Sequence, residues 1–530
     1  MGENLPWLLL ISLILIVLIG TFRKRGQTEP GAAWWLVVAL VGIVAWLRLN
    51  QVITTPQVWV AYGTMVTVNY LITFGAAYFL YKDPATLGNT DHIQQKLRIH
   101  YIIPVYNEPR FISRCVASVI EAAEFVSEIA DVVIVIVNDA STDLTTQVLQ
   151  RFAGLPNVQV MNLSKNAGKK GAIAAGSYGG ENWREGADLF LERFGRNPTR
   201  VDSNALKQCL REIGCDVPEC DIYLHTDSDS IITREFIYWQ ILAFMSDTRL
   251  GAVSGHCDVY LDADEEPSWM TRMQVAWYYT QFRIRKASES VYGAVFCVSG
   301  PGAGFWAEAV FHLFPLWVDD VFGRRIYRGA TDRMLTLLVL KDGWKVKYSE
   351  RAKVFTVVPS TGNEARKQWT RWKQNFWRML VPVWQFAWRT HPVVAFLTYS
   401  RLIVTVLAPF ILAYHLVWLS MGGVTDSALY LVGIAMMGSL MGMAYAAKNP
   451  EGWSFALLRP LMSLMSAFWG SVLTLRALTL TLKGSFTWRD SAMGKERGRL
   501  LYRWFDPPFE MRFLEVILII TVILYLIRVF

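Results

Sequence analysis

Long apolar segments occupy both ends of the chain, and a mostly polar stretch from residue 85 to about residue 380 separates them. A helix needs roughly 17 to 25 apolar residues to cross a bilayer, and each segment reaches that length. Hydrophobic residues make up 53% of the 530 residues, which is high for a soluble protein of this size. We therefore expect about six membrane-spanning helices, at residues 6–22, 33–49, 57–81, 393–418, 428–447 and 514–530.

Basic residues orient these segments, because loops rich in Lys and Arg usually stay in the cytoplasm. Arg23, Lys24 and Arg25 follow the first segment instead of preceding it. This order favours an uncleaved anchor over a signal peptide. The polar middle of the chain is then expected on the cytoplasmic side of the plasma (inner) membrane.

Residues 453–482 are apolar but contain Arg459, Pro460 and Arg476. If this segment crossed the membrane, the basic stretch that follows it would lie outside, against the charge bias. We therefore predict an amphipathic or re-entrant segment that begins and ends on the cytoplasmic side.

The chain is thus predicted to have four parts. N-terminal transmembrane helices are expected in residues 1–84 and a cytoplasmic α/β domain in residues 85–364. Residues 365–392 interleave basic and aromatic side chains, a pattern typical of amphipathic helices on a bilayer surface. A C-terminal transmembrane region is expected in residues 393–530.

Strand and helix patterns alternate in the polar part. Apolar, β-rich runs are predicted to be strands at residues 98–105, 131–137, 158–163 and 221–225, and helical patterns follow the first two. Such alternation predicts a mostly parallel sheet with helices on both faces. Ligands bind beyond the carboxyl ends of the strands in such sheets, where polar clusters occur in this chain.

The polar clusters carry groups suited to a phosphorylated ligand. Asp139 directly follows a buried strand and could accept hydrogen bonds from a nucleobase or a ribose. Residues 166–171 combine glycines with two lysines, which suits a diphosphate or, equally, a basic surface turn. Asp227 and Asp229 are two residues apart, so on an extended chain they share a face and could hold Mg²⁺ or Mn²⁺. Each cluster alone could also be a turn or a helix cap.

Net charge and cysteine spacing limit the kinds of binding partner and metal site that the chain can have. The net charge of +8 suits an anionic membrane surface or an acidic substrate, and no nucleic-acid-binding motif accompanies it. Cys209, Cys215 and Cys220 are spaced more loosely than the cysteines of a zinc site, so free thiols are expected.

Seven motifs, in this order, resemble those of the family-2 inverting glycosyltransferases, in particular the processive membrane-embedded ones: hyaluronan, chitin, nodulation chitooligosaccharide and cellulose synthases. The last motif fits the Gln-x-x-Arg-Trp signature of that family. The motifs are PVYNE (104–108), VNDAS (137–141), NAGKKGA (166–172), TDSDS (226–230), VSGPGAGF (298–305), GATDR (329–333) and QWTRW (368–372).

The resemblance implies a GT-A domain inserted into an all-α transmembrane region of about six helices with amphipathic interface helices. The implied activity is polymerisation of a β-linked polysaccharide from UDP-sugars, with Mn²⁺ or Mg²⁺, and movement of the polymer across the membrane. One alternative is a non-processive transferase that moves one sugar onto a lipid carrier. Another is a transporter or scaffold with an inactive domain. UDP-GlcNAc, UDP-GlcA and UDP-glucose all remain open as donors.

The resemblance also implies roles for individual residues. Asp332 would be the general base, with a plain salt bridge to Arg333 as the alternative, and Asp229 would bind the metal. Trp488 and Arg489, in a gating-loop candidate at 483–500, would close over the nucleotide or else form a solvated basic loop. The nucleotide would be bound by Tyr106, Glu108, Asp139, Lys169 and Asp227. The acceptor and the diphosphate would be bound by Ser299, Gly300, Thr331, Arg333, Gln368, Arg371 and Trp372.

The chain departs from the family pattern in two places. Thr331 stands before the expected base, where hyaluronan and chitin synthases have a carboxylate, so the identity of the product is left open. Residues 177–220 are longer than the corresponding stretch in hyaluronan synthases, and the sequence does not place them.

Overall fold

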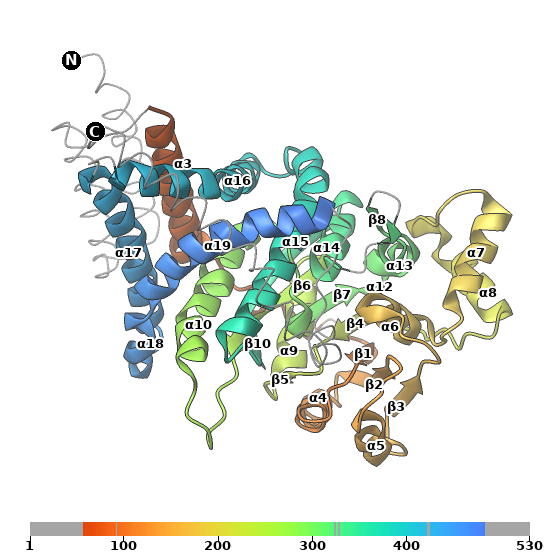
Figure 1. Ribbon diagram of the computed structural model, residues 1–530. Helices are drawn as coiled ribbons and strands as arrows, with labels where there is room; N and C mark the ends of the chain where they lie inside the picture. The colour runs from red at the N-terminus through yellow and green to blue at the C-terminus, as the bar shows by residue number, and fades with distance from the viewer. Residues whose placement is uncertain (1–56, 92, 323–324, 327–328, 421–423, 483–530) are drawn as a thin grey trace, which may run out of the picture.

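An eight-stranded mixed sheet forms the centre of the polar part of the chain in the computed structural model, which describes residues 57–91, 93–322, 325–326, 329–420 and 424–482 (Figure 1). The strand order is β3-β2-β1-β4-β7-β6-β10-β5. Most neighbours are parallel, whereas β5 and β7 pair antiparallel with theirs. The strands are β1 (Leu97–Val105), β2 (Ala130–Asn138), β3 (Val158–Asn162), β4 (Ile222–His225), β5 (Ser230–Ile232), β6 (Leu250–Val259), β7 (Ala303–Trp306) and β10 (Lys345–Thr356).

All four strands predicted from the sequence are present, as β1 to β4. Their carboxyl ends lie at one edge of the sheet because β1 pairs in parallel with both β2 and β4. This edge carries the polar clusters at residues 106–109, 138–143 and 226–229.

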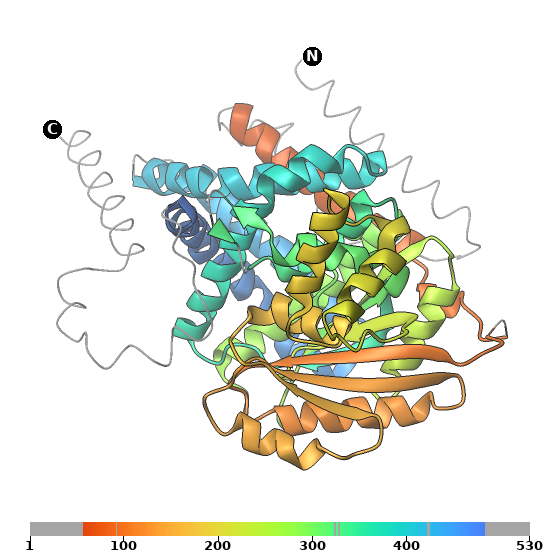
Figure 2. The same ribbon diagram turned by 90° about the vertical axis from the view of Figure 1, so that its right-hand side faces the viewer.

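Helices cover both faces of the sheet, as predicted (Figure 2). On one face, α6 approaches closely because Gly176 has no side chain: a Cβ there would lie 2.9 Å from Val137 Cγ2. The opposite face is packed by α4 and α9. The helices around the sheet, on both faces together, are α4 (Ile112–Phe125), α5 (Thr145–Leu149), α6 (Gly168–Tyr178), α9 (Phe236–Met245) and α14 (Thr331–Lys341).

Residues 177–220, which the sequence did not place, form a helical pair that projects from the sheet at one side (Figure 1). The pair consists of α7 (Trp183–Phe194) and α8 (Ser203–Glu212). They pack closely at Gly186, where a Cβ would lie 2.9 Å from Leu210 Cα. Shorter elements connect this side to the sheet: α12 (Ala307–Val310), α13 (Phe314–Val318), β8 (Val321–Phe322) and β9 (Arg325–Ile326).

Two helical segments join the sheet domain to the apolar helices. The first runs through α10 (Trp269–Tyr279), the π-helical turn Thr280–Lys286 and α11 (Ala287–Ser290). The second is α15 (Gly362–Ala387), which begins at a capping box formed by Thr361 and Glu364 and confirms the helix predicted near residue 365.

Four helices in the described part of the chain are long and apolar enough to cross a membrane. Those at Tyr62–Thr86, Pro392–His415 and Ser427–Ala446 agree with predicted spans. The predicted spans at 6–22, 33–49 and 514–530, and the gating candidates Trp488 and Arg489, lie outside the described residues. The helices are α3 (Gln57–Gly75), α16 (Pro392–Ser420), α17 (Val424–Ala446), α18 (Trp453–Leu457) and α19 (Arg459–Leu482).

The fourth helix decides between the two alternatives predicted for residues 453–482. After the short α18, α19 is one continuous helix of 24 residues, so the re-entrant alternative is wrong, and the amphipathic alternative stays a prediction. One of its two arginines, Arg459, is buried and donates hydrogen bonds to Ser463 Oγ and Thr280 Oγ1. The helix packs against α15 and α17 (Figure 1).

Candidate active site

The loops that follow β1 and β2 are joined by hydrogen bonds at the carboxyl edge of the sheet. The backbone N–H of Thr142 donates to Asn107 Oδ1 at 2.8 Å, and the N–H of Glu108 donates to Thr145 Oγ1 at 2.9 Å. Tyr106 is partly exposed at this edge. The PVYNE and VNDAS motifs therefore form one rim, and the nucleotide-binding roles of Tyr106 and Glu108 stay predictions.

Asp139 is buried and caps the turn that opens α6. Its carboxylate accepts hydrogen bonds from the backbone N–H groups of Ala167 (2.6 Å) and Gly168 (2.9 Å). Carboxylates are favourable at this position because they complement the partial positive charge of a helix N-terminus. Asp139 thus fixes the Gly-Lys-Lys turn to the end of β2, and its predicted contact with uridine stays a prediction.

Lys169, in the first turn of α6, brings two predicted site residues together. Its ammonium donates a hydrogen bond to Asp227 Oδ1 and lies 3.7 Å from Asp332 Oδ1. Burial alone lowers the pKa of Lys169, but the charges of Asp227, Asp332 and Asp229 outweigh burial and raise it. Lys169 therefore remains a cation between two carboxylates that lie 105 residues apart in the sequence (332 minus 227).

The loop at residues 298–302 closes the other side of this cluster. The N–H of Gly300 donates to Asp332 Oδ2 at 2.9 Å. A Cβ at Gly300 would contact the Lys169 ammonium and lie 3.0 Å from Asp227 Oδ1, so a side chain at this position would displace one of these two groups. Asp332 thus pairs with Lys169 and Gly300, and the alternative of a plain salt bridge to Arg333 is not what the structure shows.

The turn before Asp332 is held in a strained conformation. Ala330 adopts φ = 53°, which is uncommon for a residue with a side chain. Its N–H donates to Asn375 Oδ1 of α15 at 3.0 Å, and the carbonyl of Thr331 accepts from Trp317 Nε1 at 2.9 Å. Strain of this kind persists where surrounding contacts enforce it, often at functional sites. Asn375, which the sequence analysis did not single out, is one of those contacts.

Asp229 is also buried, at the turn between β4 and β5. The expected extended chain at this point is replaced by a turn, in which the Ser230 N–H donates to the Asp227 carbonyl at 3.0 Å. Two carboxylates close together at a strand end suit Mg²⁺ or Mn²⁺, which prefer oxygen ligands. No group of three or more metal-binding side chains occurs in the described ranges, so substrate phosphates would have to complete such a site.

The Gln-x-x-Arg-Trp motif lies on α15, next to α10. The Trp372 ring stacks on Trp277, with ring centres 5.9 Å apart and planes 21° from parallel. Trp369 contacts the same Trp277 ring at 6.1 Å. Trp372 is thus packed within the protein at this interface, and its predicted contact with a sugar ring remains a prediction.

The other two residues of the motif, Gln368 and Arg371, lie in different environments. Gln368 Oε1 is buried and has no hydrogen-bond partner in the part of the chain that is described. The charge of Arg371 acts on Tyr278: burial raises the pKa of Tyr278, Asp229 raises it further, and Arg371 opposes them. Arg371 therefore lies in the same electrostatic environment as Asp229.

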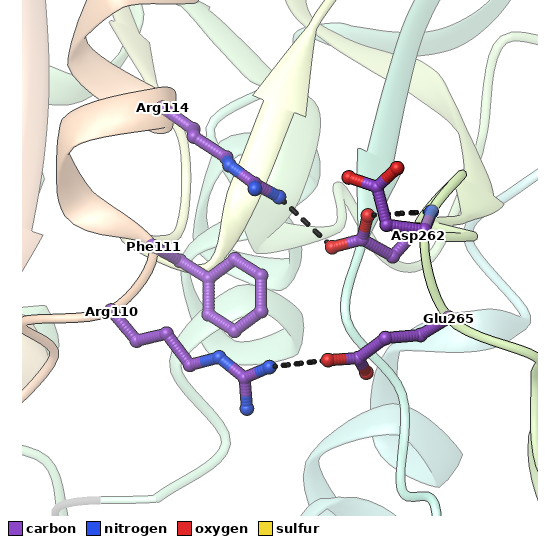
Figure 3. Close-up of a pocket in the computed structure, with 6 residues that line it drawn as sticks. Arg110, Phe111, Arg114, Asp262 and Glu265 are labelled. Carbon is purple, nitrogen blue, oxygen red and sulfur yellow. Dashed lines mark hydrogen bonds and ion pairs between the residues drawn. The ribbon is translucent and has the colours of Figure 1, made fainter.

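A separate surface pocket of about 190 Å³ lies at the start of α4 (Figure 3). Arg110 pairs there with Glu265 at 3.2 Å, and Arg114 pairs with Asp262 at 3.1 Å. Its two arginines are thus paired with two of its three carboxylates, and none of the predicted site residues lines it. The cluster around Lys169 is therefore the better candidate for the active site.

Two family models match the chain. Residues 101–177 match "Glycosyl transferase family 2" and residues 189–310 match "Chitin synthase". Together with the mixed, mostly parallel sheet, the first match defines a GT-A-like glycosyltransferase domain. Both matches confirm the resemblance drawn from the motifs: one part of the chain is similar to glycosyltransferase family 2 and the next part to chitin synthases.

Relatives with N-acetylglucosaminyltransferase and chitin synthase names agree with these two matches. The chain is 26% identical over 339 residues to an N-acetylglucosaminyltransferase of Mesorhizobium japonicum, a match that covers 64% of this chain and 66% of that protein. It is 26% identical over 245 residues to chitin synthase csm1 of Pyricularia grisea, covering 42% of this chain and 13% of that protein. The chain thus spans less than two thirds of these relatives, and the matches describe shared regions only.

Among solved structures, the chain is similar to a mannosyltransferase from Pyrobaculum calidifontis in complex with GDP-Man and Mn²⁺. The TM-score is 0.43 and the identity 17%, with 83% of this chain and 99% of that chain covered.

Proposed function

We propose that the chain transfers N-acetylglucosamine from a UDP-sugar to the end of a β-linked N-acetylglucosamine chain, and adds further sugars to make an oligomer or polymer. The single observation that carries this proposal is the contact of Lys169 with both Asp227 and Asp332. Through this contact Lys169 brings Asp227, the proposed donor-binding carboxylate, and Asp332, the proposed base, into one cluster. The choice of sugar is supported by the names of the relatives, N-acetylglucosaminyltransferase and chitin synthase.

Asp332 is the proposed general base. The acceptor hydroxyl oxygen attacks the anomeric carbon, its proton passes to Asp332, and the bond between that carbon and the diphosphate breaks. One displacement inverts the anomeric centre, so an α-linked donor gives a β-linked product. The Gly300 N–H and the Lys169 ammonium support this role because each fixes one oxygen of the Asp332 carboxylate.

Arg371 and Lys169 would contact the diphosphate, where negative charge develops as the bond breaks. Asp227 and Asp229 would hold a divalent cation, and their carboxylate oxygens fit Mg²⁺ or Mn²⁺. When bound, the cation would neutralise charge on the departing diphosphate. Because Lys169 already pairs with Asp227, its ammonium would have to share or yield that carboxylate.

The apolar helices support a membrane-associated product path. We place the catalytic domain on the cytoplasmic side of the plasma membrane, with the growing chain leaving along α15 toward α19. The row of Trp372, Trp277 and Trp369 supports this direction because it continues to Trp469 of α19, whose ring lies 5.8 Å from Trp369.

The proposal is tested with the purified full chain in detergent or nanodiscs, incubated with labelled UDP-GlcNAc, UDP-GlcA or UDP-glucose, singly and in pairs. We expect UDP release with UDP-GlcNAc alone and a chitinase-sensitive product whose size increases with time. A single labelled sugar attached to a lipid would instead support the non-processive alternative. The absence of UDP release with every donor would contradict a transferase activity.

A further inference from the structure

Lys286, which the sequence analysis did not select, is buried beneath the loop that holds Asp332. Only 6% of its surface is exposed. Its ammonium donates hydrogen bonds to Ser299 Oγ (2.5 Å) and Ser254 Oγ (2.8 Å). It also lies 4.0 Å from the centre of the Phe282 ring, a favourable position for a cation.

These contacts reach Asp332 through one loop. Ser299 precedes Gly300, whose N–H donates to Asp332 Oδ2 at 2.9 Å. The loop is also fixed on its far side, because Thr226 Oγ1 donates a hydrogen bond to the Pro301 carbonyl. Lys286 therefore supports the peptide that orients the proposed base, and this support passes through the Ser299 hydroxyl.

Lys286 lies in an unusual turn of the backbone. The residue ends the π-helical turn Thr280–Lys286, which joins α10 to α11. Wider turns of this kind are rare and occur often at functional sites. In the same turn, Arg283 pairs with Glu350 at 2.7 Å and donates to the Ala77 carbonyl at 3.1 Å. The turn thus anchors both the strand β10 and the segment after α3.

Burying a lysine is costly, which argues against a passive role. Burial lowers the pKa of Lys286 to about 8, although nearby Cys297, Cys257, Asp332 and Glu289 raise it. An apolar side chain of similar length would avoid this cost. A buried ammonium with two hydroxyl acceptors instead fixes the geometry of those hydroxyls.

We infer that Lys286 is a positioning residue for the transfer reaction: through Ser299 it holds the Gly300 N–H in place to orient Asp332. This inference rests on the proposed function. It predicts that loss of the Lys286 ammonium slows the chemical step and leaves donor binding nearly unchanged, because Lys286 donates its hydrogen bonds to Ser299 and Ser254, whereas Lys169 and Arg371 are the cations proposed to contact the diphosphate.

The test compares Lys286→Met, Ser299→Ala and the double variant in the full chain, measuring kcat, KM for UDP-GlcNAc and the thermal midpoint. We expect kcat of Lys286→Met to fall about 100-fold, as small misplacements of a reacting group can cause. KM should stay within about twofold, which is the pattern of a lost transition-state interaction. The double variant should be no slower than Lys286→Met alone, because both changes break one connection. Lys96→Met is the control, since Lys96 is half-exposed at the opposite end of β1.

A Lys286→Met protein that melts earlier but turns over at the wild-type rate per folded molecule would overturn the inference. So would independent, multiplying effects of the two substitutions. If Lys286→Met does not fold, Ser299→Ala alone decides: an unchanged kcat overturns the inference, and a lower kcat with unchanged KM supports it. Failure of the wild-type chain to use UDP-GlcNAc would instead contradict the proposed function.

Discussion

The ammonium of Lys169 lies between Asp227, with which it shares a hydrogen bond, and Asp332, whose Oδ1 is 3.7 Å away. These residues come from three separate parts of the chain: the start of α6, the end of β4 and the start of α14. Without the cation, the two carboxylates would repel each other. Lys169 therefore stabilises an arrangement in which the donor site and the base are neighbours before any substrate binds.

Replacement of Asp332 by Asn should abolish transfer while nucleotide binding persists. Asn keeps an oxygen that can accept from the Gly300 N–H, so the loop should remain in place. It cannot take a proton, and loss of a general base typically costs about 10²–10⁴-fold in kcat. The measurement is UDP release together with UDP binding by calorimetry. Asp131→Asn, at the exposed opposite end of β2, is the matched control and should retain full activity. Normal turnover of Asp332→Asn would remove the base assignment.

Gly300→Ala should inactivate the enzyme more than it destabilises the fold. The added methyl group would contact the Lys169 ammonium and approach Asp227 Oδ1 to 3.0 Å. The ammonium is at the end of a flexible side chain, so it can move, but then it leaves the two carboxylates. We expect kcat to fall at least about tenfold, the effect of about 1.4 kcal/mol. Gly470→Ala is the control, because no atom lies within 4 Å of its Cβ position. Equal activity of both variants would show that the Lys169 contacts do not matter for transfer.

Removal of divalent cations by EDTA should stop transfer, and Mn²⁺ or Mg²⁺ should restore it. Asp229→Asn should raise the cation concentration needed for half-maximal activity, since it removes one charged oxygen ligand. The measurement is UDP release across a cation titration. Asp262→Asn serves as the control because that carboxylate pairs with Arg114 in the surface pocket of Figure 3. Full activity in EDTA would rule out the role proposed for Asp227 and Asp229.

The strands of the sheet could be predicted because buried parallel strands are continuous apolar runs. β1 to β4 therefore appear at the expected positions. The order of the later strands was not predicted, since β7 inserts antiparallel between β4 and β6 through contacts remote in sequence. The continuous helix α19 was not predicted, because the basic residues that follow it in the sequence favoured a segment that begins and ends on the same side of the membrane.

The candidate site was predictable where a side chain follows a strand end or belongs to a motif. Asp227, Asp332, Lys169 and Gly300 were selected on those grounds, and the fold brings them into contact. Lys286 carried no such signal. It lies in a run of basic residues with Arg283 and Arg285, and only the tertiary structure shows that its ammonium reaches Ser299.

Acid should destabilise the fold through His225. Burial and the nearby charge of Lys169 lower the pKa of His225 to about 4, although Asp332 and Asp227 oppose them. In the unfolded chain a histidine takes up its proton near pH 6.5, so the unfolded state binds more protons between pH 6.5 and 4. Stability is therefore lost as pH falls through that range, by roughly 3 kcal/mol for this residue.

The check is the thermal midpoint of the full chain from pH 7.5 to pH 4.5. His225→Phe keeps a flat ring that can stack on Phe305 and removes the proton uptake, so its midpoint should decline less steeply than that of the wild type. His100, whose pKa burial also lowers to about 4, should account for part of the remaining decline. Identical slopes for the wild type and His225→Phe would contradict this account.

Asp320 and Asp319 are adjacent in sequence but should differ strongly in their effect on stability. Asp320 is buried between two cations, Lys170 of α6 (3.4 Å) and Arg378 of α15, and so connects the turn that carries Lys169 to the Gln-x-x-Arg-Trp helix. Asp320→Asn removes the charge of a buried anion that both cations share, and breaking a buried ion pair typically costs about 3–5 kcal/mol. Asp319 pairs with Arg184 at the surface, with both side chains almost half exposed, so Asp319→Asn should cost at most about 1 kcal/mol. Denaturant or thermal unfolding of both variants in one detergent measures the difference. Similar midpoints for the two variants would show that the buried triad does not hold α6 and α15 together.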